Sequence, residues 1–104
     1  MNLKEFRDLL LTVHPAVYHF ESHKESEYIV WHEVGSLSLM GDGAIAERGT
    51  RIAVDYFTKD EYDQVHEALE ITLAAHDDIC MAEPAVDFDK ESGLIHYAYT
   101  CEVM

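Results

Sequence analysis

The stretch Arg51-Ile-Ala-Val-Asp-Tyr-Phe57 alternates in character, and Thr58-Lys-Asp-Glu61 follows it without a break. Ile52, Val54 and Tyr56 share one face of a strand, because side chains in a strand alternate with a period of two. Thr-x-x-Glu is the sequence of a capping box, with which many helices begin. The junction therefore predicts a strand over residues 51–57 that leads directly into a helix over residues 59–76.

This predicted helix has two contrasting faces. Its apolar face recurs at three-to-four spacing and is expected to pack on a sheet: Tyr62, Val65, Leu69, Thr72 and Leu73. Its acidic face lies opposite: Asp60, Asp63, Glu67, Glu70 and Asp77. We expect the second set to form a continuous acidic edge.

Regular patterns continue on both sides of the junction. Asn2 and Glu5 have the spacing of a capping box for a first helix that ends before Pro15. Alternating or β-branched residues predict strands over 17–20, 28–34, 85–88 and 94–103, with residues 21–27 as a hairpin loop and 89–93 as a turn. The order is α-β-β-β-α-β-β in one domain, residues 1–104. Short connections imply an α+β two-layer sandwich, an antiparallel sheet of four to five strands with two helices on one face.

The segment over residues 35–50 interrupts this regular pattern. It holds four of the five glycines together with Leu37, Leu39, Met40 and Ile45. A connection of this length without regular structure is uncommon in a compact domain and is usually functional or disordered. Two alternatives remain open: a hairpin extension with some residues tucked onto the core, or an interface in which the apolar residues contact a partner.

Charge excludes two classes of function. The chain has 21 acidic residues against 7 Lys and Arg, a formal charge of −14. Nucleic-acid binders of the basic-patch kind and polybasic membrane-surface proteins need cations, so both are excluded. The charge is also uneven, with nine acids and six bases in residues 1–59 but twelve acids and only Lys90 as a base in residues 60–104.

No stretch of the sequence predicts an enzyme, a metal site or a cofactor. The seven histidines form no H-E-x-x-H or paired Cys/His spacing, and the glycines at 41 and 43 lack the Lys and hydroxyl of a phosphate-binding loop. Asp87 and Asp89 share one face of a short strand, but turns commonly carry such residues. Cys80 and Cys101 are expected to be reduced thiols. Since neither a signal core nor an apolar run long enough for a bilayer is present, a soluble intracellular product is expected.

Several short stretches follow one another in a recognisable order. They are Val17-Tyr-His-Phe20, Tyr28-Ile-Val-Trp31, Ile52-Ala-Val-Asp-Tyr-Phe-Thr58, Glu61-Tyr-Asp63, Asp89-Lys-Glu-Ser-Gly-Leu-Ile-His-Tyr97 and Cys101-Glu-Val103. In this order, with a glycine-bearing loop before the third, they resemble the small minor-capsid or tail-completion proteins of long-tailed phages and prophages. This is the tail-to-head joining and tail-terminator group, and the resemblance covers nearly the whole chain.

The resemblance implies a structural role in the virion. In that group the fold is the same α+β arrangement, and subunits close into a ring, typically six-fold, at the head-proximal end of the tail tube. Its implied partners are further copies of itself, the tail-tube protein and the head connector, after synthesis in the host cytoplasm. It implies no catalytic residues. It places the loop over 35–50 in subunit or tube contacts.

The residues are compatible with such assembly. A ring needs unlike patches on the two sides of each subunit, and the two unequally charged parts of the chain can supply them. We expect Leu37, Leu39, Met40 and Ile45 at an interface, with Arg48 and Arg51 meeting acids across it. The acidic helix edge, or the turn over residues 85–91, is expected to face a partner or the lumen, where negative charge lets DNA pass without binding.

A DNA-mimic inhibitor is the alternative function. In such a protein the carboxylates imitate phosphates and block a nuclease or another DNA-binding protein. The acidic stripe on the predicted second helix supports this alternative, whereas the long glycine-rich apolar segment is not needed for it.

Overall fold

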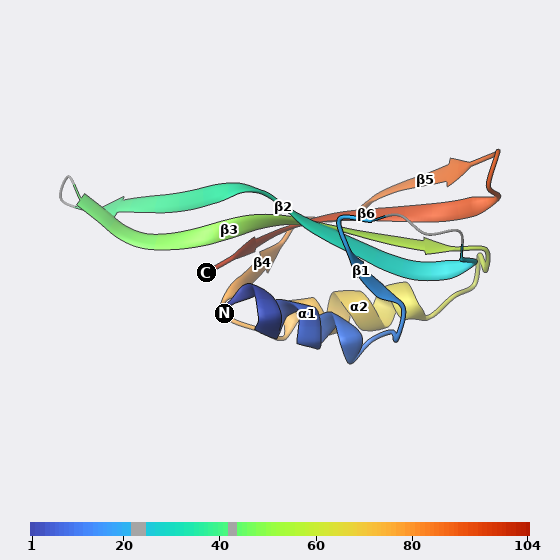
Figure 1. Ribbon diagram of the computed structural model, residues 1–104, viewed down its shortest axis with the longest axis horizontal. Helices are drawn as coiled ribbons and strands as arrows, with labels where there is room; N and C mark the ends of the chain where they lie inside the picture. Colours follow the sequence, from blue (N-terminus) through green and yellow to red (C-terminus); the bar gives the residue numbers. More distant parts are fainter. Residues whose placement is uncertain (22–24, 42–43) are drawn as a thin grey trace.

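The computed structural model describes residues 1–21, 25–41 and 44–104, and it shows an α+β fold. Two helices lie on the same side of one twisted sheet (Figure 1). The elements are α1 (Leu3–Leu11), β1 (Val17–His19), β2 (Glu27–Gly41), β3 (Ala44–Thr58), α2 (Val65–Ala74), β4 (Ile79–Met81), β5 (Ala85–Asp89) and β6 (Leu94–Val103). The predicted class, layers and order are confirmed, with β4 as one strand more than expected.

The strand order in the sheet is β1-β2-β3-β6-β4, and β5 also pairs with β6. All pairings are antiparallel except β1 with β2, which is parallel, with Val17 opposite Ile29. The predicted hairpin between the first two strands is therefore wrong. A parallel pair normally needs a long crossover, but β1 is only about 10 Å long, so the short stretch between β1 and β2 can return the chain to its starting end.

The core lies between the sheet and the two helices. Phe6 and Leu10 of α1 and Leu69 and Leu73 of α2 are fully buried. They pack against the inward residues of the sheet: Ile29, Trp31, Ile52, Val54, Tyr56, Tyr99, Cys101 and Val103. The predicted alternation is thereby confirmed over residues 51–57, and over residues 97–103 of the last strand, where Tyr99, Cys101 and Val103 belong to this cluster and Tyr97 packs against it.

The first helix begins as its sequence predicts. The Asn2 side chain accepts a hydrogen bond from the Glu5 amide at 2.8 Å, and the Glu5 carboxylate accepts one from the Asn2 amide at 3.2 Å. This is a complete capping box. It fixes the start of α1, so Phe6 and Leu10 face the sheet.

The second helix begins six residues later than predicted. The Thr58 hydroxyl accepts a hydrogen bond from the Asp60 amide at 3.1 Å, and Asp60 Oδ1 accepts one from the Tyr62 amide at 3.0 Å. The Thr58 side chain, which a capping box would need, is therefore engaged in a local turn. As a result Tyr62, expected on the packed face, is 84% exposed and lies before the helix.

Candidate assembly surface

The largest departure from the sequence prediction is a projecting arm, defined as residues 35–41 of β2 and 44–49 of β3. The sequence indicated an irregular segment, with a hairpin extension as one alternative, but the two strands of the arm pair regularly, from Leu37 opposite Gly49 to Gly41 opposite Ala44. Figure 1 shows the arm leaving the helix-covered body. The molecule measures 50 × 24 × 22 Å, and its radius of gyration of 14.6 Å exceeds the ~13 Å of a compact domain of this size.

The arm lacks a third strand among the described residues. Pairing of β1 with β2 ends at Trp31, and pairing of β6 with β3 ends at Thr50. An isolated two-stranded ribbon is marginally stable at best in water, and a third strand or a packed face is needed to stabilise it. Both outer edges of the arm therefore offer free backbone groups, and the arm gains stability if another chain pairs with it.

Five of the predicted interface residues are part of the arm. The backbone register places Met40 opposite Ile45, Leu39 opposite Glu47, Ser38 opposite Arg48 and Leu37 opposite Gly49. The side chains of residues 37–48 lie outside the described part of the structure. The sixth residue, Arg51, lies at the root of the arm, where its guanidinium is 3.4 Å from the Glu102 carboxylate of the same chain.

A glycine fixes the point where the arm leaves the body. A Cβ atom at Gly49 would lie 2.6 Å from the Val103 carbonyl oxygen and 2.6 Å from the Met104 sulfur. No larger residue fits here without moving the end of β6. Gly35 on the opposite strand has open space around it. The close approach at Gly49 thus joins the arm to the C-terminal end of the sheet.

The five predicted acidic residues do not form one helix edge. Asp60 and Asp63 precede α2, and Asp77 follows it, so only Glu67 and Glu70 lie on the helix. Asp63 is only 6% exposed. The predicted continuous edge is wrong, because the helix is shorter than the capping sequence indicated.

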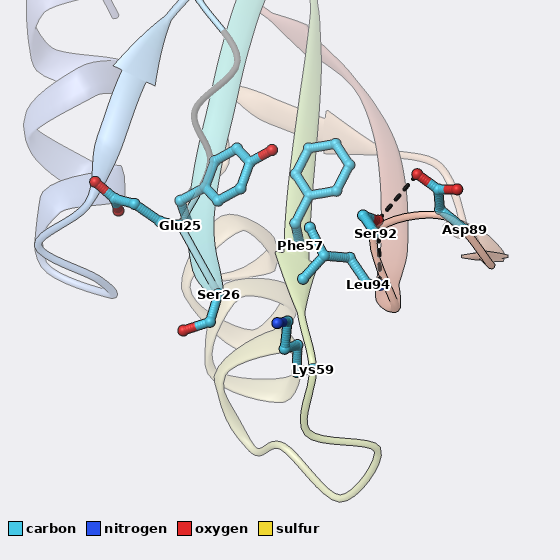
Figure 2. A pocket seen from close by; sticks show the side chains of 8 residues that line it. Glu25, Ser26, Phe57, Lys59, Asp89, Ser92 and Leu94 are labelled. Atoms are coloured by element: carbon cyan, nitrogen blue, oxygen red, sulfur yellow. Dashed lines mark hydrogen bonds between the residues drawn. The ribbon is translucent and has the colours of Figure 1, made fainter.

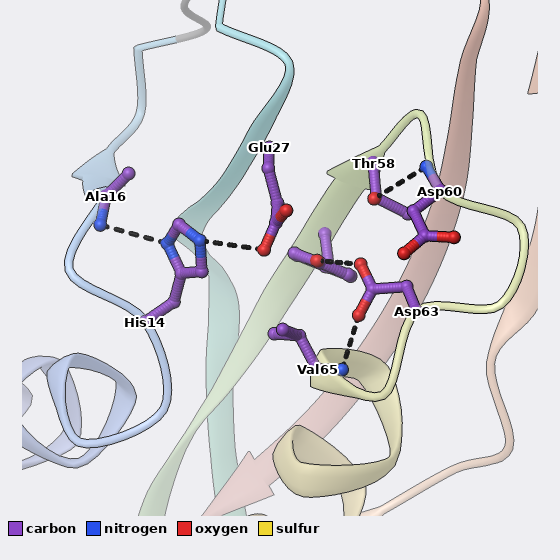
Figure 3. Close-up of polar contacts among 8 residues, drawn as sticks. His14, Ala16, Glu27, Thr58, Asp60, Asp63 and Val65 are labelled. Carbon is purple, nitrogen blue, oxygen red and sulfur yellow. Dashed lines mark hydrogen bonds and ion pairs between the residues drawn. The ribbon is translucent and has the colours of Figure 1, made fainter.

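Asp63 instead holds the start of α2 against the sheet. Its carboxylate accepts hydrogen bonds from the hydroxyl of the fully buried Tyr56 and from the Val65 amide (Figure 3). Burial, and next the Asp63 contact, raise the pKa of Tyr56 above its usual value. The Tyr56 hydroxyl thus stays protonated and donates to the carboxylate.

A histidine contact closes the same end of the sheet. The Ala16 amide donates to His14 Nδ1 at 3.0 Å, so Nε2 carries the proton and donates to Glu27 at 3.0 Å (Figure 3). This contact joins the segment after α1 to the first residue of β2. Asp63, in the turn before α2, makes its own contacts at the same end of the body (Figure 3).

β5 is the second exposed feature of the sheet. All five of its residues are exposed, including Val86 at 58% and Phe88 at 55%. Val86 lies opposite Tyr97 and Phe88 opposite Ile95, and among the strands that the structure describes β5 pairs with β6 alone. Asp87 and Asp89 have local roles. Asp87 accepts from the Phe88 amide at 2.8 Å, and Asp89 accepts from the Ser92 hydroxyl at 2.9 Å.

An open hollow of about 420 Å³ lies on the sheet face away from the helices. Figure 2 shows Phe57 and Leu94 in it, with Glu25, Lys59 and Asp89 around them. Phe57 stacks between Tyr28 and His96, with ring centroids 4.8 and 4.4 Å apart. The hollow can hold a side chain of a partner.

Among the described residues, the cysteines, the potential metal ligands and the helices indicate no further role for this surface. Cys80 and Cys101 are free, and burial raises the pKa of Cys101 to about 12, which leaves its thiol unreactive. The described residues contain no group of three or more potential metal ligands. None of the helices in the described chain is both long and apolar enough to cross a membrane.

Sequence reasoning missed one part of this surface and one buried contact. The exposed edge of β5 had a signal, the alternation Ala85-Val-Asp-Phe-Asp89, but the sequence does not say that the apolar side of this strand is uncovered. The contact between Tyr56 and Asp63 had no signal in the sequence. It depends on the turn before α2, where the sequence indicated a capping box instead. No protein-family model matches the chain, and no curated protein matches its sequence.

Proposed function

We propose that this protein is a non-enzymatic structural subunit of a phage or prophage virion. Its copies form a ring at the head-proximal end of the tail tube. In the tail-completion proteins that the sequence resembles, this ring is typically six-fold. The ring ends the tail and joins it to the head connector. The partners are further copies of the chain, the tail-tube protein and the connector protein.

The observation that carries this proposal is the arm. Residues 35–41 and 44–49 form a two-stranded ribbon without a third strand among the described residues, although such a ribbon needs further packing to be stable. Its sequence contains Leu37, Leu39, Met40 and Ile45, which gain free energy when a partner removes them from water. A subunit that assembles through this arm accounts for both features.

Unequal surfaces at the two ends of the molecule also support assembly into a ring. The arm lies at one end of the long axis, and β5 with its acidic turn lies at the other (Figure 1). A contact between unlike patches is heterologous, and it closes into a ring when the rotation between subunits allows. The α+β fold is the one that the resemblance implies.

The DNA-mimic alternative has lost its supporting feature. It required a row of carboxylates along one helix, but Asp63 is buried and Asp60 and Asp77 lie outside α2. We therefore propose the structural function and not the DNA-mimic function. The exposed acids Asp60, Glu67 and Asp77 remain candidates to face a partner or the lumen.

Electron microscopy of particles from a phage lacking this gene tests the proposal. We expect unjoined heads and tails, or tails of irregular length, and rescue by the wild-type gene. A variant in which Asn-Gly replaces residues 37–49 should not rescue, because a two-residue turn closes the shortened hairpin without the arm. Ser36→Ala, a small change at an exposed position at the root of the arm, is the matched control and should rescue. Normal infectious particles without the gene would contradict the proposal.

A further inference from the structure

The outer edge of β5 has no partner strand among the described residues. The strand pairs with β6 on one side, and its five residues are all exposed. Large apolar side chains two residues apart, Val86 and Phe88, are more than half exposed. Free sheet edges with exposed apolar residues are sites where another strand adds by backbone hydrogen bonds.

The arm has the complementary form. Both of its outer edges are unpaired among the described residues, and its two strands are seven and six residues long where β5 has five. An arm strand therefore matches β5 in length and in free backbone groups. Its sequence contains apolar residues, which could cover the exposed side chains of Val86 and Phe88.

Charge favours the arm over a second copy of β5. Residues 83–91 carry four acids and only Lys90 as a base, so two β5 edges side by side would bring like charges together. The described part of the arm carries one acid and one base, Glu47 and Arg48. An arm strand can therefore approach the acidic β5 edge without this repulsion.

We propose that the arm of one copy adds to the β5 edge of the next copy as a further strand of its sheet. Because arm and edge lie at opposite ends of the 50 Å axis, the contact is head-to-tail and can continue from copy to copy. This inference deepens the proposed function and rests on it, since it names the contact by which the subunits would assemble.

Two variants, each lacking one half of the contact, test this pairing. The armless variant has Asn-Gly in place of residues 37–49, and the edge variant carries Val86→Lys and Phe88→Lys. By light scattering after size-exclusion chromatography, wild-type protein should form oligomers as its concentration rises, and each variant alone should stay monomeric. An equimolar mixture of the two should form a species of twice the monomer mass, because one arm meets one intact edge and the chain of contacts stops there.

Ile71→Lys is the matched control for the edge variant. Ile71 is 71% exposed and belongs to α2, not to β5, so the same change of chemistry should leave oligomerisation intact. Far-ultraviolet circular dichroism verifies that every variant is folded. The pairing is overturned if wild-type protein remains monomeric at millimolar concentration, if the edge variant assembles like wild type, or if the mixture stays monomeric.

The phage assay separates this inference from the proposed function. If the edge variant joins heads to tails as well as wild type while the armless variant does not, the β5 contact is wrong and the structural function stands. If wild-type protein assembles by this contact but particles without the gene are normal, the contact stands and the structural function is wrong.

Discussion

β2 and β3 lie in two different environments along their length. In the body, Ile29, Trp31, Val54 and Tyr56 are buried under the helices, and the two strands have neighbours on both sides. In the arm, the same two strands have only each other among the described residues. The backbones of β2 and β3 pair in the same way in both parts, so the difference lies in what surrounds the paired strands.

This difference separates folding from assembly. Burial of apolar surface is the dominant favourable contribution to folding, and in this chain it is concentrated between the body of the sheet and the two helices. None of the described residues of that core lies in the arm, so we expect the arm sequence to be free to serve a contact with another chain. Changes in the body should therefore alter stability, and changes in the arm should alter assembly.

Leu69→Ala should have the largest effect on stability. Leu69 is fully buried on α2, and its truncation should lower the free energy of unfolding by about 2–5 kcal/mol because it leaves a cavity. Urea denaturation measures the change. The control is Ile71→Ala on the exposed side of the same helix, which should stay within about 0.5 kcal/mol of wild type. Equal losses for the two variants would mean that α2 does not pack as described.

Asp63→Ala should have the next largest effect. The change removes the acceptor of the buried Tyr56 hydroxyl and the side-chain bond to the first amide of α2, so we expect a loss of about 3 kcal/mol. Asp77→Ala, an exposed acid beyond the helix, should be nearly neutral. Adding Tyr56→Phe to Asp63→Ala should recover part of the loss, since the buried Tyr56 hydroxyl is then no longer left without its acceptor. A double variant no more stable than Asp63→Ala would contradict this account.

Gly49→Ala should act at the boundary between body and arm. Its Cβ would overlap the Val103 carbonyl oxygen, so the end of β6 must shift, at about 1–2 kcal/mol. Gly35→Ala has open space and should be neutral or stabilising by up to about 1 kcal/mol, since alanine restricts the unfolded chain. Thermal unfolding of the two variants compares them directly. If both lose the same stability, the close approach at Gly49 is not what fixes the root of the arm.

The body could be predicted from the sequence because local patterns agree there with the tertiary environment. Residues 51–57 and 94–103 alternate, and each of their faces meets a different environment, so the period of two is enough to orient them. The capping box at Asn2 is equally local and forms as expected. In each case one residue pattern has one structural outcome.

The arm and the start of α2 could not be predicted because their patterns allow more than one outcome. Glycines at positions 35 and 49 indicate a loop, yet pairing with the partner strand holds both in the ribbon, and such pairing is not a local property of the sequence. Thr58 and Glu61 have capping-box spacing, but the buried Thr58 hydroxyl accepts from the Asp60 amide instead. Of the candidate surface, the sequence located the arm residues but neither their regular structure nor the uncovered edge of β5.

Replacement of residues 37–49 by Asn-Gly should change stability least, although it removes more of the chain than any other variant. The arm has no third strand among the described residues, so its removal should alter the free energy of unfolding of the monomer by less than about 1 kcal/mol. Urea denaturation of dilute, monomeric protein measures this, and the slope with urea should fall only slightly because little buried surface is lost. A loss comparable to that of Leu69→Ala would show that the arm folds back on its own body. The apolar residues of the arm would then belong to the core of their own chain and would not be available to a neighbouring copy.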